Sequence, residues 1–173
     1  MSDIAASLVV IIKPINAVEW QEHKVYRLTS PVVQLGRARK CQINLAMGDS
    51  LVSRVHATMY KYDENEDYMI QDGQPGVSTI SDPDPAPIPS SLGTLVNGQY
   101  LTYTIKETGE EVESRVAKDL GLELVANKRL LKDRDEIIIV PNMIKVVYLR
   151  STRKITEDLD KTVIPDEYRT PEK

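Results

Sequence analysis

The chain has 173 residues, and acidic residues outnumber basic ones to give a formal net charge of −4. This balance argues against a general nucleic-acid binder, which needs basic stripes. The single cysteine, Cys41, excludes an intrachain disulfide, and no apolar segment approaches the ~20 residues of a membrane span. We therefore expect a cytoplasmic protein, with one domain over residues 1–150 and a polar tail over residues 151–173, that binds neither nucleic acid nor membrane.

Short runs rich in Val, Ile, Thr and Tyr recur along the chain, with Gly, Pro, Asn and Asp between them. This spacing predicts many short strands and therefore an all-β sandwich or barrel. Asn97-Gly98 lies between two such runs and predicts a two-residue turn with positive φ at both residues. The first apolar run lacks the basic residues that precede the core of a secretory signal, so we interpret it as a strand. The predicted strands are Leu8–Ile12, Lys24–Leu28, Val32–Leu35, His56–Tyr62, Tyr68–Gln71, Thr94–Val96, Gln99–Ile105, Glu136–Val140 and Ile144–Leu149.

Two internal segments interrupt the strand pattern. Residues 82–89 are rich in proline, which cannot donate to a ladder, so they predict an exposed loop with polyproline character. Within residues 107–127, Val112, Val116 and Leu120 have helical spacing; a capping box from Thr108 to Glu111 and a closing Gly121 favour a short helix. A hairpin that turns at Thr108-Gly109 is the alternative, because Val112, Ser114 and Val116 also alternate.

Polar motifs in loops suggest a receptor for an oxyanion. Arg37 offers a planar fork that can hold two oxygens, and Arg54 offers a second guanidinium. Ser53 offers a hydroxyl, and the backbone beside it can add N–H groups. Gly36, directly before Arg37, would let the end of a strand bend without a side-chain clash.

Catalytic and metal-binding alternatives have less support. Ser53 and His56 suggest a nucleophile and a base, but there is no Gly-x-Ser-x-Gly elbow and no evident acid to orient the histidine. His23, His56 and Cys41 are far apart in the sequence, so a transition-metal site is not indicated. We expect no enzymatic activity, no metal and no cofactor.

Six short motifs follow one another in a fixed order along the chain. They are Leu35-Gly36-Arg37, Ile43-Asn44-Leu45, Val52-Ser53-Arg54-Val55-His56-Ala57, Asp72-Gly73, Gly93-Thr94-Leu95-Val96-Asn97-Gly98 and Leu131-Lys132-Asp133-Arg134-Asp135-Glu136-Ile137. In this order the motifs resemble the forkhead-associated (FHA) family over about residues 6–150. The resemblance implies a SMAD/FHA-like β-sandwich of two twisted sheets, with a short helix in an insertion, that binds phosphothreonine peptides without catalysis. A phosphothreonine carries about −1.5 to −2 charges and three acceptor oxygens, so its receptor needs fixed donors.

The resemblance also assigns roles to residues. Arg37 and Ser53 would bind phosphate, with Arg54 beside them, and Ser91 would contact the phosphothreonine. Thr94 would line the recognition loop, Asn97 would order the loops from behind, and His56 would brace them. The predicted phosphopeptide-binding set is Arg37, Ser53, Arg54, Ser91, Thr94 and Asn97, and the predicted structural support is Gly36, His56, Gly93 and Gly98.

The chain departs from the family pattern in and near the recognition loop. Leu92 stands where the family has an asparagine that bonds the peptide backbone, and losing such a bond costs about 1 kcal/mol, roughly tenfold in affinity. Insertions cover about residues 74–89 and 102–127. The alternative function is therefore a structural interaction scaffold with a degraded phosphate site, which binds its partner through the inserted loops.

The resemblance implies an adaptor in Ser/Thr-kinase signalling whose partner is a phosphothreonine protein, either a kinase or its substrate. The polar tail adds a regulatory hypothesis, because Thr162 and Thr170 lie where a kinase could phosphorylate them. Reach favours capture of phosphorylated Thr162 by a second molecule, which gives self-association, and makes Thr170 the better candidate for the chain's own site.

Overall fold

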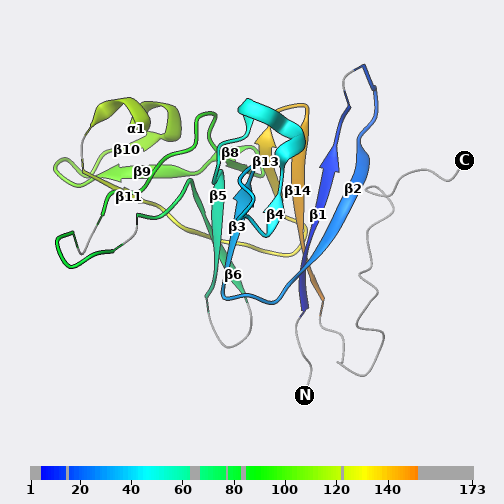
Figure 1. Ribbon diagram of the computed structural model, residues 1–173, viewed down its shortest axis with the longest axis horizontal. Helices are drawn as coiled ribbons and strands as arrows, with labels where there is room; N and C mark the ends of the chain where they lie inside the picture. Colours follow the sequence, from blue (N-terminus) through cyan, green and yellow to red (C-terminus); the bar gives the residue numbers. More distant parts are fainter. Residues whose placement is uncertain are drawn as a thin grey trace, which may run out of the picture.

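The computed structural model describes residues 5–14, 16–62, 67–76, 78–82, 85–121 and 123–151. The predicted tail, with Thr162 and Thr170, lies outside the described residues. The fold is an all-β sandwich, in which a six-stranded and a five-stranded sheet pack face to face (Figure 1). Among the described residues, no helix has both the length and the apolar character that crossing a membrane requires.

The six-stranded sheet has the order β2-β1-β14-β13-β7-β8, and its neighbouring strands are antiparallel. β1 and β14 pair along their whole length, so that Ala5 lies opposite Ser151. The two ends of the described chain therefore lie at the same end of the sandwich. The strands are β1 (Ala5–Ile12), β2 (Gln21–Leu28), β7 (Leu95–Val96), β8 (Gln99–Tyr100), β13 (Glu136–Val140) and β14 (Ile144–Ser151).

The five-stranded sheet has the order β12-β6-β5-β3-β4, and its only parallel pair is β3 with β4. A 3₁₀ segment, η1 (Ala46–Leu51), follows β4 and lies at the upper end of the sandwich in Figure 1, whereas β1 begins and β14 ends at the lower end. The strands are β3 (Val32–Gly36), β4 (Ile43–Asn44), β5 (Ala57–Lys61), β6 (Tyr68–Asp72) and β12 (Arg129–Leu130).

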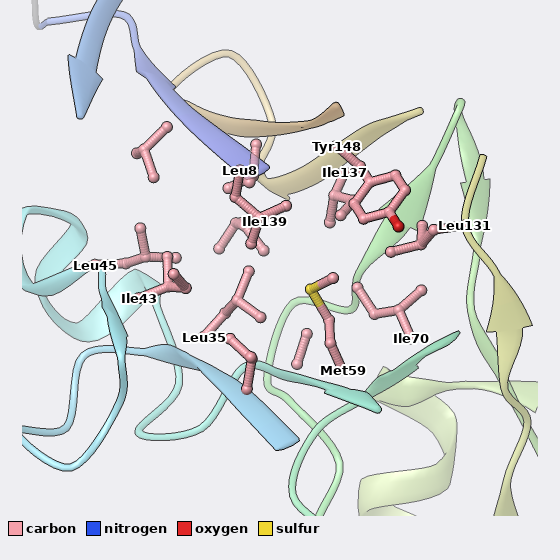
Figure 2. Packing of buried hydrophobic residues seen from close by; sticks show 14 of the residues in the cluster. Leu8, Leu35, Ile43, Leu45, Met59, Ile70, Leu131, Ile137, Ile139 and Tyr148 are labelled. Atoms are coloured by element: carbon pink, nitrogen blue, oxygen red, sulfur yellow. The ribbon is translucent and has the colours of Figure 1, made fainter. Parts of the chain in front are cut away.

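The core lies between these two sheets and consists of aliphatic side chains and tyrosines, since the chain has no phenylalanine. Figure 2 shows Leu8, Ile137 and Ile139 of one sheet pointing toward Leu35 and Met59 of the other. Alternate residues of each strand face inward, as the period of two in a strand requires. This packing fixes the strand ends from which the polar loops extend.

Residues 102–127 form a third sheet, in the order β10-β9-β11, together with one helix beside the sandwich (Figure 1). Both sequence interpretations were right in part: the chain turns between β9 and β10, with Gly109 at φ 72°, and then enters a helix that Gly121 closes at φ 62°. The elements are β9 (Thr102–Ile105), β10 (Glu111–Glu113), α1 (Ser114–Leu120) and β11 (Leu124–Ala126).

The predicted capping box and apolar stripe of this helix were wrong. Thr108 lies in the turn, where its hydroxyl accepts from the Glu110 N–H, and the helix begins only after Glu113. Val116 and Leu120 are exposed, whereas Ser114 and Ala117 are buried. The inward face of α1 is therefore small and partly polar, which lets it approach the loops of the sandwich closely.

The described residues between 74 and 89 form an irregular loop, as the prolines of residues 82–89 predicted. Its ends are joined by two backbone hydrogen bonds between Gln74 and Ile88, of 2.9 and 2.7 Å. A Cβ on Gly73, whose φ is 72°, would lie 2.1 Å from the Ile88 carbonyl oxygen. A glycine is therefore required where the chain leaves β6, because the returning end of the loop passes close to it.

Candidate functional site

The end of β3 lies against residues 53–56, directly before β5. The Arg37 N–H donates to the Ser53 carbonyl (3.2 Å), and the His56 N–H donates to the Leu35 carbonyl (2.7 Å). A Cβ on Gly36 would lie 2.2 Å from the Arg54 carbonyl oxygen. Gly36 was predicted to let the end of the strand bend without a side-chain clash, and the clash that it avoids is with the backbone of Arg54.

Cys41 strengthens the same contact from the β3–β4 loop. Its buried thiol donates to the Arg54 carbonyl at 3.2 Å, and the same oxygen accepts from the Ala38 N–H at 3.1 Å. Burial raises the pKa of the Cys41 thiol, which keeps it protonated and able to donate. The backbone of Arg54 is thus fixed while its side chain is exposed.

Arg37 is exposed but oriented. Its Nε donates to the Val52 carbonyl oxygen at 2.8 Å. In the described part of the chain, neither terminal nitrogen of Arg37 has an acceptor, and neither Arg37 nor Arg54 forms an ion pair with a carboxylate. Because one edge of the guanidinium is held by the protein, the other edge is left to bind an external oxyanion.

Ser53 connects this loop to residues 90–94, which we call the recognition loop. Its Oγ accepts from the Ser91 N–H at 2.9 Å. A hydroxyl that accepts inside the protein directs its own proton elsewhere. The Ser53 hydroxyl therefore keeps its own proton for another acceptor.

His56 is fully buried and bridges the two loops. Its Nδ1 accepts from the Ser53 N–H at 3.2 Å, so the neutral ring carries its proton on Nε2 and donates to the Gly93 carbonyl at 2.8 Å. Burial lowers the pKa of His56, with smaller opposing contributions from the Gly93 carbonyl and Asp72. Both ring nitrogens are occupied by backbone groups, so His56 braces the loops and is not positioned to take a proton from the Ser53 hydroxyl.

Asn97 and Gly98 form the predicted turn between β7 and β8, with φ of 50° and 81°. The Asn97 amide donates to the Asp135 carboxylate at 2.9 Å, and its carbonyl oxygen accepts from the Glu136 N–H at 2.9 Å. Its side chain therefore joins the turn to the start of β13.

Comparisons with known proteins give a family match for part of the chain. Residues 33–113 match the family model of the FHA domain. This match identifies an FHA domain over residues 33–113. No curated protein matches the sequence.

Solved structures show the same fold. The kinase-interacting FHA domain of the kinase associated protein phosphatase KAPP from Arabidopsis is 21% identical with a TM-score of 0.53, and the match covers 89% of this chain and 99% of that one. Full-length yeast Pml1p is 13% identical with a TM-score of 0.51, and the match covers 86% of this chain and 83% of that one.

A buried carboxylate holds the recognition loop of this FHA domain, and sequence reasoning missed its role. Asp72 accepts from the Ser90 N–H (2.9 Å) and the Ser90 hydroxyl (2.5 Å). It also accepts from the Thr94 hydroxyl (2.6 Å) and the Tyr103 hydroxyl (2.8 Å). Burial, followed by the charge of Asp72, raises the pKa of Tyr103, so this phenol remains a donor. Four donors compensate for the burial of one negative charge.

Thr94 was predicted to line the recognition loop and to bind the phosphopeptide, but its side chain is buried beneath that loop. Thr94 is fully buried, and its hydroxyl contacts Asp72 and, at 3.2 Å, the His56 carbonyl oxygen. Gly93, at φ 88°, lies above it, where a Cβ would meet the Tyr100 ring at 2.9 Å. Both residues support the recognition loop from within.

Ser91 and Lys118 form the outer part of the site. Ser91 is exposed, and its Oγ accepts from the Lys118 ammonium of α1 at 2.7 Å. Lys118 was missed from the sequence because it lies 27 residues beyond Ser91, in a segment interpreted only as an insertion. Leu92, between Ser91 and Gly93, is partly buried and packs against the main core. The residue that replaces the family asparagine therefore contributes packing.

Proposed function

We propose that this FHA domain is a non-catalytic reader of phosphothreonine peptides that acts as an adaptor in Ser/Thr-kinase signalling. The observation that carries the proposal is the alignment of donors at Arg37, Ser53 and Ser91. Each of these groups already makes one contact inside the protein, which leaves its remaining N–H or O–H groups available. A dianionic phosphate needs such an array of fixed donors.

The placement of the two serines supports the same proposal. The Ser91 N–H donates to the Ser53 hydroxyl, so the Ser53 side chain lies against the backbone from which Ser91 extends. Each hydroxyl accepts from the protein and can donate to a phosphate oxygen. Donors held in place before binding cost little ordering entropy when the ligand arrives.

The partner we propose is a protein phosphorylated on threonine, either a Ser/Thr kinase or its substrate, in the cytoplasm. KAPP, whose FHA domain is kinase-interacting, offers a parallel. The described chain ends at the lower end of the sandwich, whereas η1 and the loops beside it lie at the upper end (Figure 1). A tail phosphorylated at Thr162 would therefore reach a second molecule more readily than its own site, which would link copies of the chain.

The test is calorimetric titration with a degenerate phosphothreonine peptide library, beside its phosphoserine and unphosphorylated counterparts. Arg37→Ala should weaken binding about ten- to hundredfold, because a charge-assisted hydrogen bond contributes about 1.5–3 kcal/mol. Arg39→Ala, which removes an exposed arginine from the same loop, is the matched control and should have little effect. Equal binding of the phosphorylated and unphosphorylated libraries would refute the proposal.

The second candidate is a scaffold with a degraded phosphate site, and Leu92 is the observation in its favour. Leu92 cannot donate to a peptide backbone, and it is turned partly into the core. A scaffold would capture the same partner before and after phosphatase treatment, and with Arg37→Ala as well as with the unchanged chain. The titration above therefore separates the two candidates.

A further inference from the structure

We propose that Lys118 of α1 is an additional phosphate ligand, supplied by the segment of residues 102–127. This inference rests on the proposed reader function and adds a third cation to the site of Arg37 and Arg54. The Lys118 ammonium lies 2.7 Å from the Ser91 hydroxyl oxygen. A phosphate oxygen bound by that hydroxyl would lie within about 5–6 Å of the ammonium even in an extended arrangement, and direct contact needs only rotation of the lysine chain.

The position of Lys118 is fixed by its helix. Ser114, one turn earlier on the same face, is fully buried, and its hydroxyl donates to the Ser90 carbonyl oxygen. The same hydroxyl lies 3.3 Å from the Ser90 Oγ. Because residues four apart share one face of a helix, anchoring Ser114 on Ser90 directs Lys118 toward Ser91.

The sheet under the helix is anchored to the same loop. Tyr103 of β9 donates to the carboxylate and to the main-chain carbonyl of Asp72, each at 2.8 Å. Asp72 also holds Ser90. The segment that carries Lys118 is therefore attached to the recognition loop at two places, the helix and the sheet.

The ammonium also has unused capacity. Lys118 has three donors, and only one is engaged, with Ser91. In the described part of the chain it forms no ion pair with a carboxylate. Lys118 therefore contacts a serine that would itself donate to the phosphate, and its charge is not balanced by a carboxylate among the described residues. It is placed to neutralise the charge of a bound phosphate dianion.

The experiment compares Lys118→Gln with Arg115→Gln in titrations with the degenerate phosphothreonine library. Both changes remove one positive charge from α1, and both side chains are exposed, so folding should be preserved in both. Glutamine can still donate a hydrogen bond to Ser91, so the difference in affinity between Lys118→Gln and the unchanged chain reports the effect of the charge. We expect Lys118→Gln to weaken binding about tenfold and to reduce its salt dependence, whereas Arg115→Gln changes the affinity less than about twofold. Lys118→Arg should retain most of the affinity.

A double-mutant cycle separates direct contact from an effect through Ser91. If Lys118 binds the phosphate itself, Lys118→Gln still weakens binding severalfold in a Ser91→Ala background. A loss that disappears in that background would overturn the inference, as would equal effects of Lys118→Gln and Arg115→Gln.

The same data separate the inference from the function on which it rests. If the unchanged chain binds the phosphothreonine library and loses it with Arg37→Ala, but Lys118→Gln binds normally, only the role of Lys118 is refuted. If the unchanged chain does not distinguish the phosphorylated library from the unphosphorylated one, the reader function itself is refuted.

Discussion

Replacing the buried Asp72 carboxylate should loosen the recognition loop and the sheet beside it together. Asp72 is 1% exposed and accepts four hydrogen bonds, from the Ser90 N–H and the hydroxyls of Ser90, Thr94 and Tyr103. The informative changes are Asp72→Ala, which removes both acceptors, and Asp72→Asn, which keeps one acceptor and adds a donor.

The structure distinguishes these changes because the four donors do not depend equally on Asp72. In Asp72→Ala, the Tyr103 hydroxyl keeps the Asp72 main-chain oxygen, and the Thr94 hydroxyl keeps the His56 carbonyl. The Ser90 N–H keeps no acceptor among its described contacts. One buried donor without a partner costs about 1–3 kcal/mol, and the loss of the bonds to a charged acceptor adds to this, so we expect about 3–5 kcal/mol in total.

Asp72→Asn should cost less, about 1.5–3 kcal/mol. The asparagine oxygen can accept from the Ser90 N–H, and its amide can face the Ser90 and Thr94 hydroxyls, which can rotate to accept. The cost then comes mainly from replacing charge-assisted bonds with neutral ones.

Urea unfolding followed by circular dichroism measures the free energy of unfolding of both variants. The control is Asp119→Asn, on the exposed face of α1. Its free energy of unfolding should lie within about 0.5 kcal/mol of that of the unchanged chain. The reasoning is refuted if Asp72→Ala costs less than about 1 kcal/mol, or if Asp72→Asn is the more damaging of the two. Either result would mean that the donors around Asp72 find other acceptors without cost.

Three further changes test other parts of the site. Burial lowers the pKa of His56, so below about pH 6.5 the unfolded ring gains a proton that the folded ring does not. The free energy of unfolding should therefore decrease as the pH is lowered, by up to about 1.4 kcal/mol per pH unit. Urea titrations should show that His56→Gln removes this slope and that His23→Gln does not. Gly36→Ala places a methyl carbon 2.2 Å from the Arg54 carbonyl oxygen, so thermal denaturation should show a loss of about 1–3 kcal/mol or more, and an unchanged melting temperature would contradict the backbone contact. Leu92→Asn gives up packing against the core but restores an amide, so phosphothreonine-peptide titration should show about tenfold tighter binding together with lower stability; unchanged affinity would mean that this side chain does not face the peptide.

The strands that the sequence predicted best are those long enough to show alternation. Glu136–Val140 was predicted with its observed bounds, and the first strand was predicted as Leu8–Ile12 and found as Ala5–Ile12. β4 and β12 have two residues each and were missed, since a strand of that length is defined by the backbone it pairs with. The run Gln99–Ile105 became two strands in two sheets, with the buried Leu101 between them.

The sequence also indicated the positions of some site residues better than those of others. The family resemblance predicted that Arg37, Ser53 and Ser91 belong to one site, and in the structure the Ser91 N–H donates to the Ser53 hydroxyl at 2.9 Å. The motifs could not show burial, so Thr94 was assigned to the surface although it faces Asp72. They also could not show Lys118, because its approach to Ser91 depends on the packing of a helix whose inward face was predicted from the wrong residues.

The two segments predicted as insertions therefore differ in their physical relation to the recognition loop. The loop of residues 74–89 is closed at its base by the pair of hydrogen bonds between Gln74 and Ile88, so the loop can vary in length without changing the sandwich to which it is attached. Residues 102–127 share buried hydrogen bonds with Ser90 and Asp72 through Ser114 and Tyr103. Their sheet and helix stabilise the same loop that would hold the phosphothreonine. A segment that fixes a binding loop from within can also contribute a ligand to it, and Lys118 is the side chain placed to do so.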